Sequence, residues 1–599
     1  MRRFLRDFFC VAGLIALFCS TPFVLYAHRG GARGSNDYEE NSEKGKSTCM
    51  STGKSTGINT DMSAGKVNSD SDGRIKFQVD SVMKRLTLRE KVSQLFIIEF
   101  VSKQSDDVKH YQNKLIRHKI GGVIIMDDSL APAIERMNKF RRIAKVPLLI
   151  TIDGEWGASM RFKELPAFPK QMQLGALSSD KLIYKMGYAI GKECKNLGIH
   201  VNFAPDVDIN NNPENPAINV RSFGEDPEKV ALYGAAYMEG MKAAGVAGSA
   251  KHFPGHGDTN VDSHKSLPVL PFGVGRLQTT ELYPFRFLIG KGVDMVMVGH
   301  LQVPVLDSTG APASISRPII TGFLKEKMGF DGIVCTDALN MDGVSKMSGL
   351  PKKKIPLAAF KAGADILLMP QEVDNSIDEI VKAIDSGEID EIMLDEKVRK
   401  IVALKARLGL FSKEEKELEI DTAGLSERSV KQANIDIINK ICAATVTVLT
   451  NQSCNSLFTP GKLYQPVLPL KKLKYNKVAY VGYGDMESGA AFSSTLIRGG
   501  KIYDATVFPL DTFIVSQQTD LSKMELLRDR LKSYDLIILG LHDTDSRPNK
   551  NFGLNESKMN FFADWATKQN IVAVYFGSPY AIAKIPGIKS YKAFVIAYS

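Results

Sequence analysis

At 599 residues the chain is longer than one ordinary hydrophobic core, so two or more folded units are expected. Its 44% apolar and 24% charged residues are typical of a soluble globular protein. The net charge of +10 comes from 77 basic and 67 acidic residues spread along the chain in short clusters. Without an arginine-rich strip or a nucleic-acid motif, this charge excludes nucleic acid as an expected partner.

The N-terminus has the order of regions found in an export signal. Arg2, Arg3 and Arg6 precede an apolar stretch at 8–18, and small-residue cleavage is available after Ala27. We predict a signal peptide at 1–27 and an exported protein, periplasmic or associated with the cell envelope. An N-terminal anchor is the alternative, because 8–27 is just long enough to span a bilayer. The five cysteines beyond the signal are scattered and odd in number, so no disulfide framework is expected.

Residues 28–75 are rich in Ser, Gly, Asn, Asp and Lys, and they contain few large apolar side chains. Such a stretch cannot bury enough surface to order itself, so we predict a disordered tether. A first domain is predicted at 76–410. Near its start, Thr87 and Glu90 have the spacing of a capping box and predict a helix beginning there.

Within this first domain, short apolar runs rich in β-branched residues alternate with longer polar or amphipathic stretches. Runs of this kind, separated by helix-length segments, are typical of parallel strands with helical crossovers. Eight of them predict an α/β fold of the (β/α)8 barrel type, and a doubly wound sheet is the alternative. The runs are 94–100, 122–126, 147–153, 200–206, 247–252, 293–300, 332–337 and 364–369.

Several of these runs end on a polar residue that can do chemistry. A barrel enzyme carries its active site at the C-terminal ends of the strands, so these side chains are expected at one mouth. The strand-ending residues are Asp153, Asp206, His252, His300 and Asp337.

A polar helical connector is predicted at 411–440, followed by a second α/β domain with a mostly parallel sheet at 441–599. Its strands are expected at 444–449, 478–482, 506–510, 536–541, 571–576 and 593–597, with a crossover helix at 524–531. Since the last apolar run lies two residues from the end, we expect this domain to be incomplete at its C-terminus, as in a longer parent protein.

A histidine-rich segment runs from Lys251 to His264 and includes His252 and His256 at helical metal-motif spacing. Pro254 and Gly255 lie between them and break any helix, so we expect no metal and no other cofactor. Loop histidines beside carboxylates are suited to acid/base work near neutral pH instead.

The apolar run before Asp337 delivers a single carboxylate to the expected barrel mouth. Together with the histidine-rich loop, it supplies the ionised nucleophile and the separate proton donor that a glycosidase needs. Either element alone has a simpler explanation as a helix cap or a loop residue.

Four segments together resemble glycoside hydrolase family 3, of the β-N-acetylglucosaminidase type. The resemblance covers about residues 80–410, and more weakly the later α/β region. The segments are 251–267 with its Asp262-Ser263-His264 core, Thr336-Asp337-Ala338-Leu339, Ile152-Asp153-Gly154-Glu155 and 219–224.

The resemblance implies a role for each matching position. Asp337 would attack the anomeric carbon, His264 would be the general acid/base, and Asp262 would hold its imidazole. The residues implied to bind the non-reducing sugar are Asp153, Arg161, Arg221, Lys251 and His252. The chain departs from the usual Gln-Glu-Gly-Gly of the sugar loop at Gly154-Glu155-Trp156-Gly157, where Trp156 would alter the pocket or stack on a second sugar.

The function expected from this resemblance is retaining hydrolysis of terminal β-linked N-acetylglucosamine, from peptidoglycan fragments outside the cytoplasm. Three alternatives remain open: a β-N-acetylglucosaminide phosphorylase, a β-glucosidase of the same family, and a cell-wall glycan-binding protein without activity. The Asp-Ser-His core favours N-acetylglucosamine over glucose as the substrate.

Overall fold

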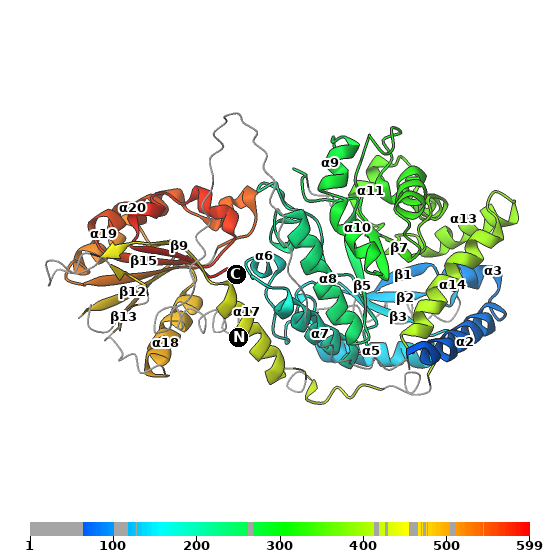
Figure 1. Cartoon of the computed structure of the whole chain (residues 1–599), viewed down its shortest axis with the longest axis horizontal. Helices are drawn as coiled ribbons and strands as arrows, with labels where there is room; N and C mark the ends of the chain where they lie inside the picture. The colour runs from blue at the N-terminus through cyan, green and yellow to red at the C-terminus, as the bar shows by residue number, and fades with distance from the viewer. Residues whose placement is uncertain are drawn as a thin grey trace, which may run out of the picture.

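The computed structural model describes residues 64–598 except for 101–117, 127–128, 262–266, 413–418, 426–428, 430, 455–464, 469, 471–474, 476, 503–509 and 543. Figure 1 shows a larger body of blue to green elements beside a smaller body of yellow to red ones. The predicted signal peptide and most of the predicted tether lie outside the described residues.

Eight parallel strands form the larger body, in the order β7-β6-β5-β4-β3-β2-β1-β8. They are β1 (Phe96–Phe100), β2 (Gly122–Ile125), β3 (Leu149–Ile152), β4 (Val201–Asn202), β5 (Ala247–Phe253), β6 (Met295–Val298), β7 (Ile333–Thr336) and β8 (Leu367–Leu368). The Thr336 N–H donates to the Ile366 carbonyl at 3.0 Å, which joins the two end strands and closes the sheet. The predicted barrel is therefore confirmed, and the doubly wound alternative was wrong.

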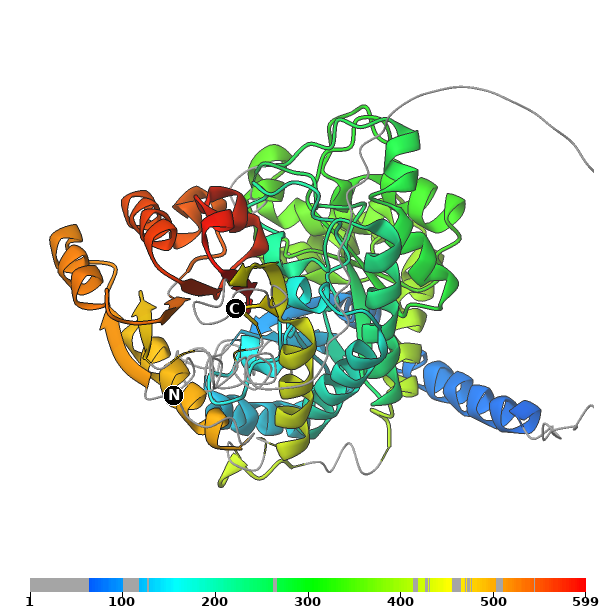
Figure 2. The same ribbon diagram turned by 60° about the vertical axis from the view of Figure 1, so that its left-hand side comes forward.

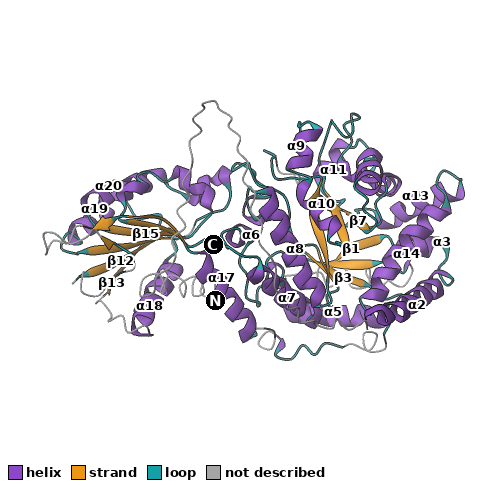
Figure 3. Ribbon diagram, in the orientation of Figure 1, coloured by secondary structure: helices purple, strands orange, loops and turns teal. Residues whose placement is uncertain are grey.

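The helices pack around this barrel, as the turned view in Figure 2 and the purple elements of Figure 3 show. Because helices cover the outside and side chains fill the inside, the strands β2, β3, β6 and β7 are buried along their whole length. The main helices are α3 (Leu88–Ser93), α5 (Leu130–Ile143), α6 (Gln171–Leu174), α7 (Lys181–Asn196), α8 (Pro227–Ala243), α9 (Val274–Thr279), α10 (Tyr283–Gly290), η4 (Pro318–Lys327), α11 (Asp342–Met347), α12 (Ile355–Ala362), α13 (Val373–Asp385) and α14 (Glu391–Arg407).

Local signals set some of the helix boundaries. Helix α3 starts with the predicted capping box, in which the Thr87 hydroxyl accepts the Glu90 N–H and the Glu90 carboxylate accepts the Thr87 N–H. The tether boundary at 75 was placed too late, because helix α2 (Ala64–Met83) begins inside the predicted tether. Its last part packs on the barrel through buried Val79 and Met83, and Asp80 pairs with Arg399 of α14 at 2.6 Å.

The smaller body is a six-stranded sheet in the order β13-β12-β14-β15-β16-β9, in which only the β9–β16 pair is antiparallel. Its elements are α17 (Gln432–Thr445), β9 (Thr447–Asn451), β12 (Val478–Tyr483), α18 (Met486–Ile502), β13 (Leu510–Val515), α19 (Leu521–Arg530), β14 (Leu536–Leu541), η7 (Pro548–Gly553), α20 (Glu556–Lys568), β15 (Ile571–Tyr575), η8 (Pro579–Lys584), η9 (Ile588–Ser590) and β16 (Ala593–Ile596); β10 (Ser453–Cys454) and β11 (Gln465–Pro466) form a separate ribbon.

The predicted second α/β domain is confirmed as a fold, with one strand misplaced. Instead of 506–510, β13 starts at Leu510, and most of the predicted run lies outside the described residues. As the edge strand, β13 is only partly buried, so its apolar pattern is weak. In the part of the chain that the structure describes, no helix is long and apolar enough to cross a bilayer.

Candidate active site

The C-terminal mouth of the barrel gathers the polar residues that end its strands. Asp153 directly follows β3, Asp337 directly follows β7, and His252 is the last residue but one of β5. Asp206 and His300 lie shortly after β4 and β6. Because all eight strands are parallel, their C-terminal ends meet at one mouth and bring these side chains together, as predicted.

Asp337 is half-buried and held in place by backbone contacts. Its N–H donates to the Val298 carbonyl at 2.9 Å, and its carboxylate accepts the Ala338 N–H at 2.7 Å. Burial alone would raise the pKa of Asp337, but the charges of His252 and His300 and the Ala338 N–H outweigh it and hold the pKa at about 2. The carboxylate is therefore ionised at neutral pH, as a nucleophile must be.

Asp153 is fixed between two cations. Its carboxylate accepts from Arg161 Nη2 at 2.8 Å and from Lys251 Nζ at 3.0 Å. Burial would raise the pKa of Asp153, but the charges of Lys251 and Arg161 lower it below its usual value. Part of the carboxylate still faces solvent, so its remaining acceptor sites can take sugar hydroxyl groups.

Glu155 is a buried carboxylate that shares Lys251 with Asp153. It receives a two-pronged contact from Arg221, with Nε at 3.0 Å and Nη2 at 2.8 Å, and Lys251 Nζ lies 2.9 Å from it. Although burial opposes ionisation, the charges of Arg221 and Lys251 lower the pKa of Glu155. Arg221 Nη2 also lies 3.3 Å from Asp206, so one guanidinium links two carboxylates.

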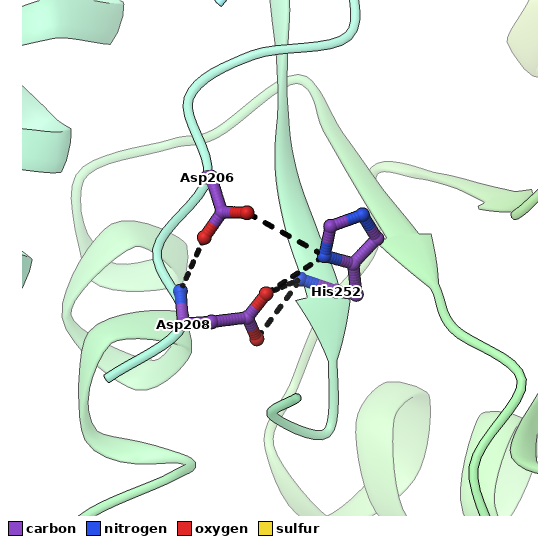
Figure 4. A group of neighbouring side chains, drawn as sticks. All are labelled: Asp206, Asp208 and His252. Atoms are coloured by element: carbon purple, nitrogen blue, oxygen red, sulfur yellow. Dashed lines mark hydrogen bonds and ion pairs between the residues drawn. The ribbon is translucent and has the colours of Figure 1, made fainter. Parts of the chain in front are cut away.

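His252 is held by a carboxylate behind it. Its Nδ1 lies 2.7 Å from Asp208 Oδ2, and Asp208 also accepts the backbone N–H groups of His252 and His256, at 3.2 and 2.6 Å. Asp206 accepts the Asp208 N–H at 3.0 Å, so the three side chains in Figure 4 form one cluster. Burial and the Asp208 charge raise the pKa of Asp206 well above its usual value.

This cluster could in principle hold a metal ion, because ligand atoms of Asp206, Asp208 and His252 lie within 4.8 Å of one another. Its surroundings do not suit one. The Arg221 guanidinium lies 3.3 Å from both Asp206 Oδ2 and His252 Nε2, which places a fixed positive charge beside the donors. Since Asp208 already accepts three N–H groups, the donor set fits a hydrogen-bonded network better than a cation site.

The structure brings all five residues implied in sugar binding into this one network, close to Asp337. Asp262 and His264 lie outside the described residues, so their predicted placement stays a prediction. Nearby, His256 is buried and contacts Thr259 Oγ1 at 2.8 Å, while Asp258 pairs with Arg276 at 3.0 Å.

Sequence reasoning overlooked Asp208 and assigned no specific role to Glu155 or His300. Glu155 entered only as part of a motif, and Asp208 was overlooked although it stands two residues after the strand-ending Asp206. A search for alternating carboxylates just beyond each strand would have found Asp208. His300 was marked as a strand end, but not as the ring that contacts the Ala338 carbonyl at 3.0 Å.

Another buried carboxyl, Glu193 of α7, contacts the loop that follows Asp153. Glu193 Oε1 accepts the Ala158 N–H at 2.8 Å, and burial raises the pKa of this carboxyl to about 7 from an ordinary value of 4.5. Between these pH values the folded protein keeps a proton that the unfolded chain has lost. Stability should therefore fall as the pH rises from about 4.5 to about 7, by about 3 kcal/mol in total.

Glu193→Gln should remove this dependence, because the amide keeps the acceptor for Ala158 and does not ionise. Urea unfolding at pH 5 and pH 8 measures it, with the exposed Glu135→Gln as a control. A wild-type slope that survives in the Glu193→Gln variant would contradict the assignment.

The barrel is closed, and its mouth holds an ionised carboxylate and a network of charged hydrogen-bonding groups. This combination is typical of the barrel glycoside hydrolases. Comparison with known proteins specifies the class: the chain belongs to glycosyl hydrolase family 3, whose N-terminal domain matches residues 87–404. The predicted family and enzyme class are thereby confirmed.

Three known proteins are similar to this chain in sequence or structure. The chain is 36% identical over 325 residues to "Beta-hexosaminidase A" of Pseudoalteromonas piscicida, a match that covers 49% of this chain and 54% of that protein. It is 30% identical to "Beta-N-acetylglucosaminidase/beta-glucosidase" of Cellulomonas fimi, over 69% of this chain and 71% of that protein. A family 3 β-N-acetylglucosaminidase structure from Paenibacillus sp. str. FPU-7 aligns with a TM-score of 0.66 and 28% identity, over 86% of this chain and 94% of that one.

Proposed function

We propose that the protein is a retaining β-N-acetylhexosaminidase that removes terminal, non-reducing β-linked N-acetylglucosamine. The observation that carries the proposal is the ionised carboxylate of Asp337 at the barrel mouth, with its pKa held at about 2. The relatives named as β-hexosaminidase and β-N-acetylglucosaminidase support the choice of sugar.

In the first step, an Asp337 oxygen attacks C1 of the sugar, and the bond from C1 to the leaving oxygen breaks. His264, which lies three residues after the described Val261, gives its proton to that oxygen. In the second step, water attacks C1, His264 takes the proton of that water, and the bond from C1 to Asp337 breaks. Asp262 would hold the imidazole and favour its charged form.

The sugar itself would be bound by the network at the mouth. Asp153 offers carboxylate acceptors, while Lys251, Arg161 and Arg221 offer charged donors. These groups are already fixed by one another, so little side-chain freedom is lost when the sugar binds. We further propose that the protein is exported and acts on peptidoglycan fragments, supported by the export-signal pattern at 1–27.

Hydrolysis of a chromogenic β-N-acetylglucosaminide should exceed hydrolysis of the matching glucoside. Comparable rates on both sugars would point to a broader β-glucosidase, and no turnover of either would point to a glycan-binding protein. Rates with and without inorganic phosphate separate hydrolysis from phosphorolysis, because only a phosphorylase forms the sugar phosphate.

The first sugar released should be the β-anomer, because two successive displacements at C1 restore its configuration. Proton NMR during the first minutes of the reaction measures the anomer before mutarotation. An α-anomer appearing first would exclude the glycosyl-enzyme on Asp337.

A further inference from the structure

One tyrosine of the second domain contacts the barrel beside the active site. Tyr580 lies in η8, shortly after β15, and its hydroxyl donates to the Asn210 carbonyl at 2.6 Å. Lys584 of the same element lies 3.6 Å from Glu214. In both Figure 1 and Figure 2 the red C-terminal segments lie next to the barrel.

Asn210 connects this contact to the segment that carries Arg221. Its side-chain oxygen accepts the Asn219 N–H at 2.9 Å, and its own N–H donates to the Gly224 carbonyl at 3.0 Å. Asn219 has a φ of 42°, in the left-handed region that asparagine adopts more readily than most other residues, and the bond to Asn210 fixes it in that conformation. Arg221 follows two residues later and pairs with Glu155 at 2.8 Å.

The same segment, residues 206–224, reaches the site at both of its ends. Asp206 and Asp208 lie at its start, and Asp208 holds the His252 ring at 2.7 Å. In its middle, the Asn215 amide donates to the carbonyls of His256 and Gly257, both at 2.8 Å. The segment therefore supports Arg221, His252 and the turn that leads toward the proposed acid/base loop, while Tyr580 supports the segment.

We propose that Tyr580 is a positioning residue through which the second domain holds segment 206–224, and with it Arg221, in the arrangement that binds the sugar. This inference rests on the proposed function, because the ligand is the N-acetylglucosamine unit named there. Burial and the nearby Glu225 carboxylate raise the pKa of Tyr580 to about 12, so its hydroxyl stays a donor throughout the working pH range.

Tyr580→Phe in the full chain removes only the hydroxyl that reaches the barrel. Tyr534→Phe is the matched control, because the Tyr534 hydroxyl bonds Asp511 of β13, inside the second domain at the far edge of its sheet. With a chromogenic β-N-acetylglucosaminide, we expect KM to rise about fivefold in Tyr580→Phe, as for the loss of one hydrogen bond, with kcat within twofold. Amide hydrogen exchange of 209–224 should quicken by a similar factor.

The route through Asn210 has its own test. Asn210→Ala breaks the bond to Asn219 but leaves the carbonyl that Tyr580 contacts. If both residues act on one path, Tyr580→Phe should add little to KM in the Asn210→Ala background. If the double variant instead raises KM by the product of the two single-variant increases, the two residues act independently and that path is overturned.

An unchanged KM and unchanged exchange in Tyr580→Phe would overturn the proposal, as would equal changes in Tyr534→Phe. Failure of the proposed function shows differently, as a wild-type protein that does not cleave the N-acetylglucosaminide. In that case the exchange measurement still decides the matter: faster exchange in Tyr580→Phe alone supports the positioning role, and unchanged exchange overturns it.

Discussion

Asp337→Ala should lower kcat on an N-acetylglucosaminide by on the order of 10⁴-fold or more while the protein stays folded. The chemistry is lost because no other group can form the bond to C1. The fold should persist because the side chain is only half-buried and its carboxylate accepts a single described hydrogen bond, from the Ala338 N–H. Activity and the melting temperature are measured together.

The matched control is Asp342→Ala, an exposed carboxylate five residues along that pairs only with Lys346 in the described part of the chain. It should change neither quantity. Azide gives a second readout, since it can occupy the space left by the side chain and displace the leaving group directly, which yields the α-glycosyl azide. Near-normal turnover in folded Asp337→Ala would remove this residue from the mechanism.

His264→Ala should slow substrates with poor leaving groups far more than aryl glycosides with acidic phenols. A poor leaving group needs a proton in the transition state, and general acid catalysis contributes on the order of 10²- to 10⁴-fold. An imidazole with an ordinary pKa of about 6.5 can both give and take that proton near neutral pH. Parallel kinetics on a nitrophenyl glycoside and an alkyl glycoside measure the difference.

In this variant azide should form the β-glycosyl azide, because it attacks the glycosyl-enzyme on Asp337 without needing a base. The two variants are thus distinguished by opposite anomers of the same product. His118→Ala is the control, since this histidine pairs with Asp374 outside the site. Equal losses on both substrates, with no azide product, would mean that His264 only stabilises its loop.

Much of the fold was predictable because its signals are local. Seven of the eight barrel strands lie within the predicted apolar runs, and β5 extends one residue beyond its run, to Phe253. Parallel strands buried on both faces consist of short, mostly apolar segments, which makes them visible in the sequence. Asp153 and Asp337 were identifiable because each directly follows an apolar run, and the end of such a run can be located in the sequence. Helix α2 was not predicted, because its polar sequence is ordered by packing on the barrel and by the pair Asp80–Arg399, 319 positions apart.

The sequence by itself determined the barrel, the family and the residue types at the strand ends, because strand period, motif spacing and position depend on near neighbours in the chain. Only the tertiary structure decided the pKa values of these residues and the partners that hold their side chains. Glu155 meets Arg221 across 66 positions, Asp208 meets His252 across 44, and Tyr580 meets Asn210 across 370. Hydrogen bonds depend on the distances between side chains, and pKa values depend on burial and on nearby charges. These distances and this burial exist only when the distant segments have come together in the fold.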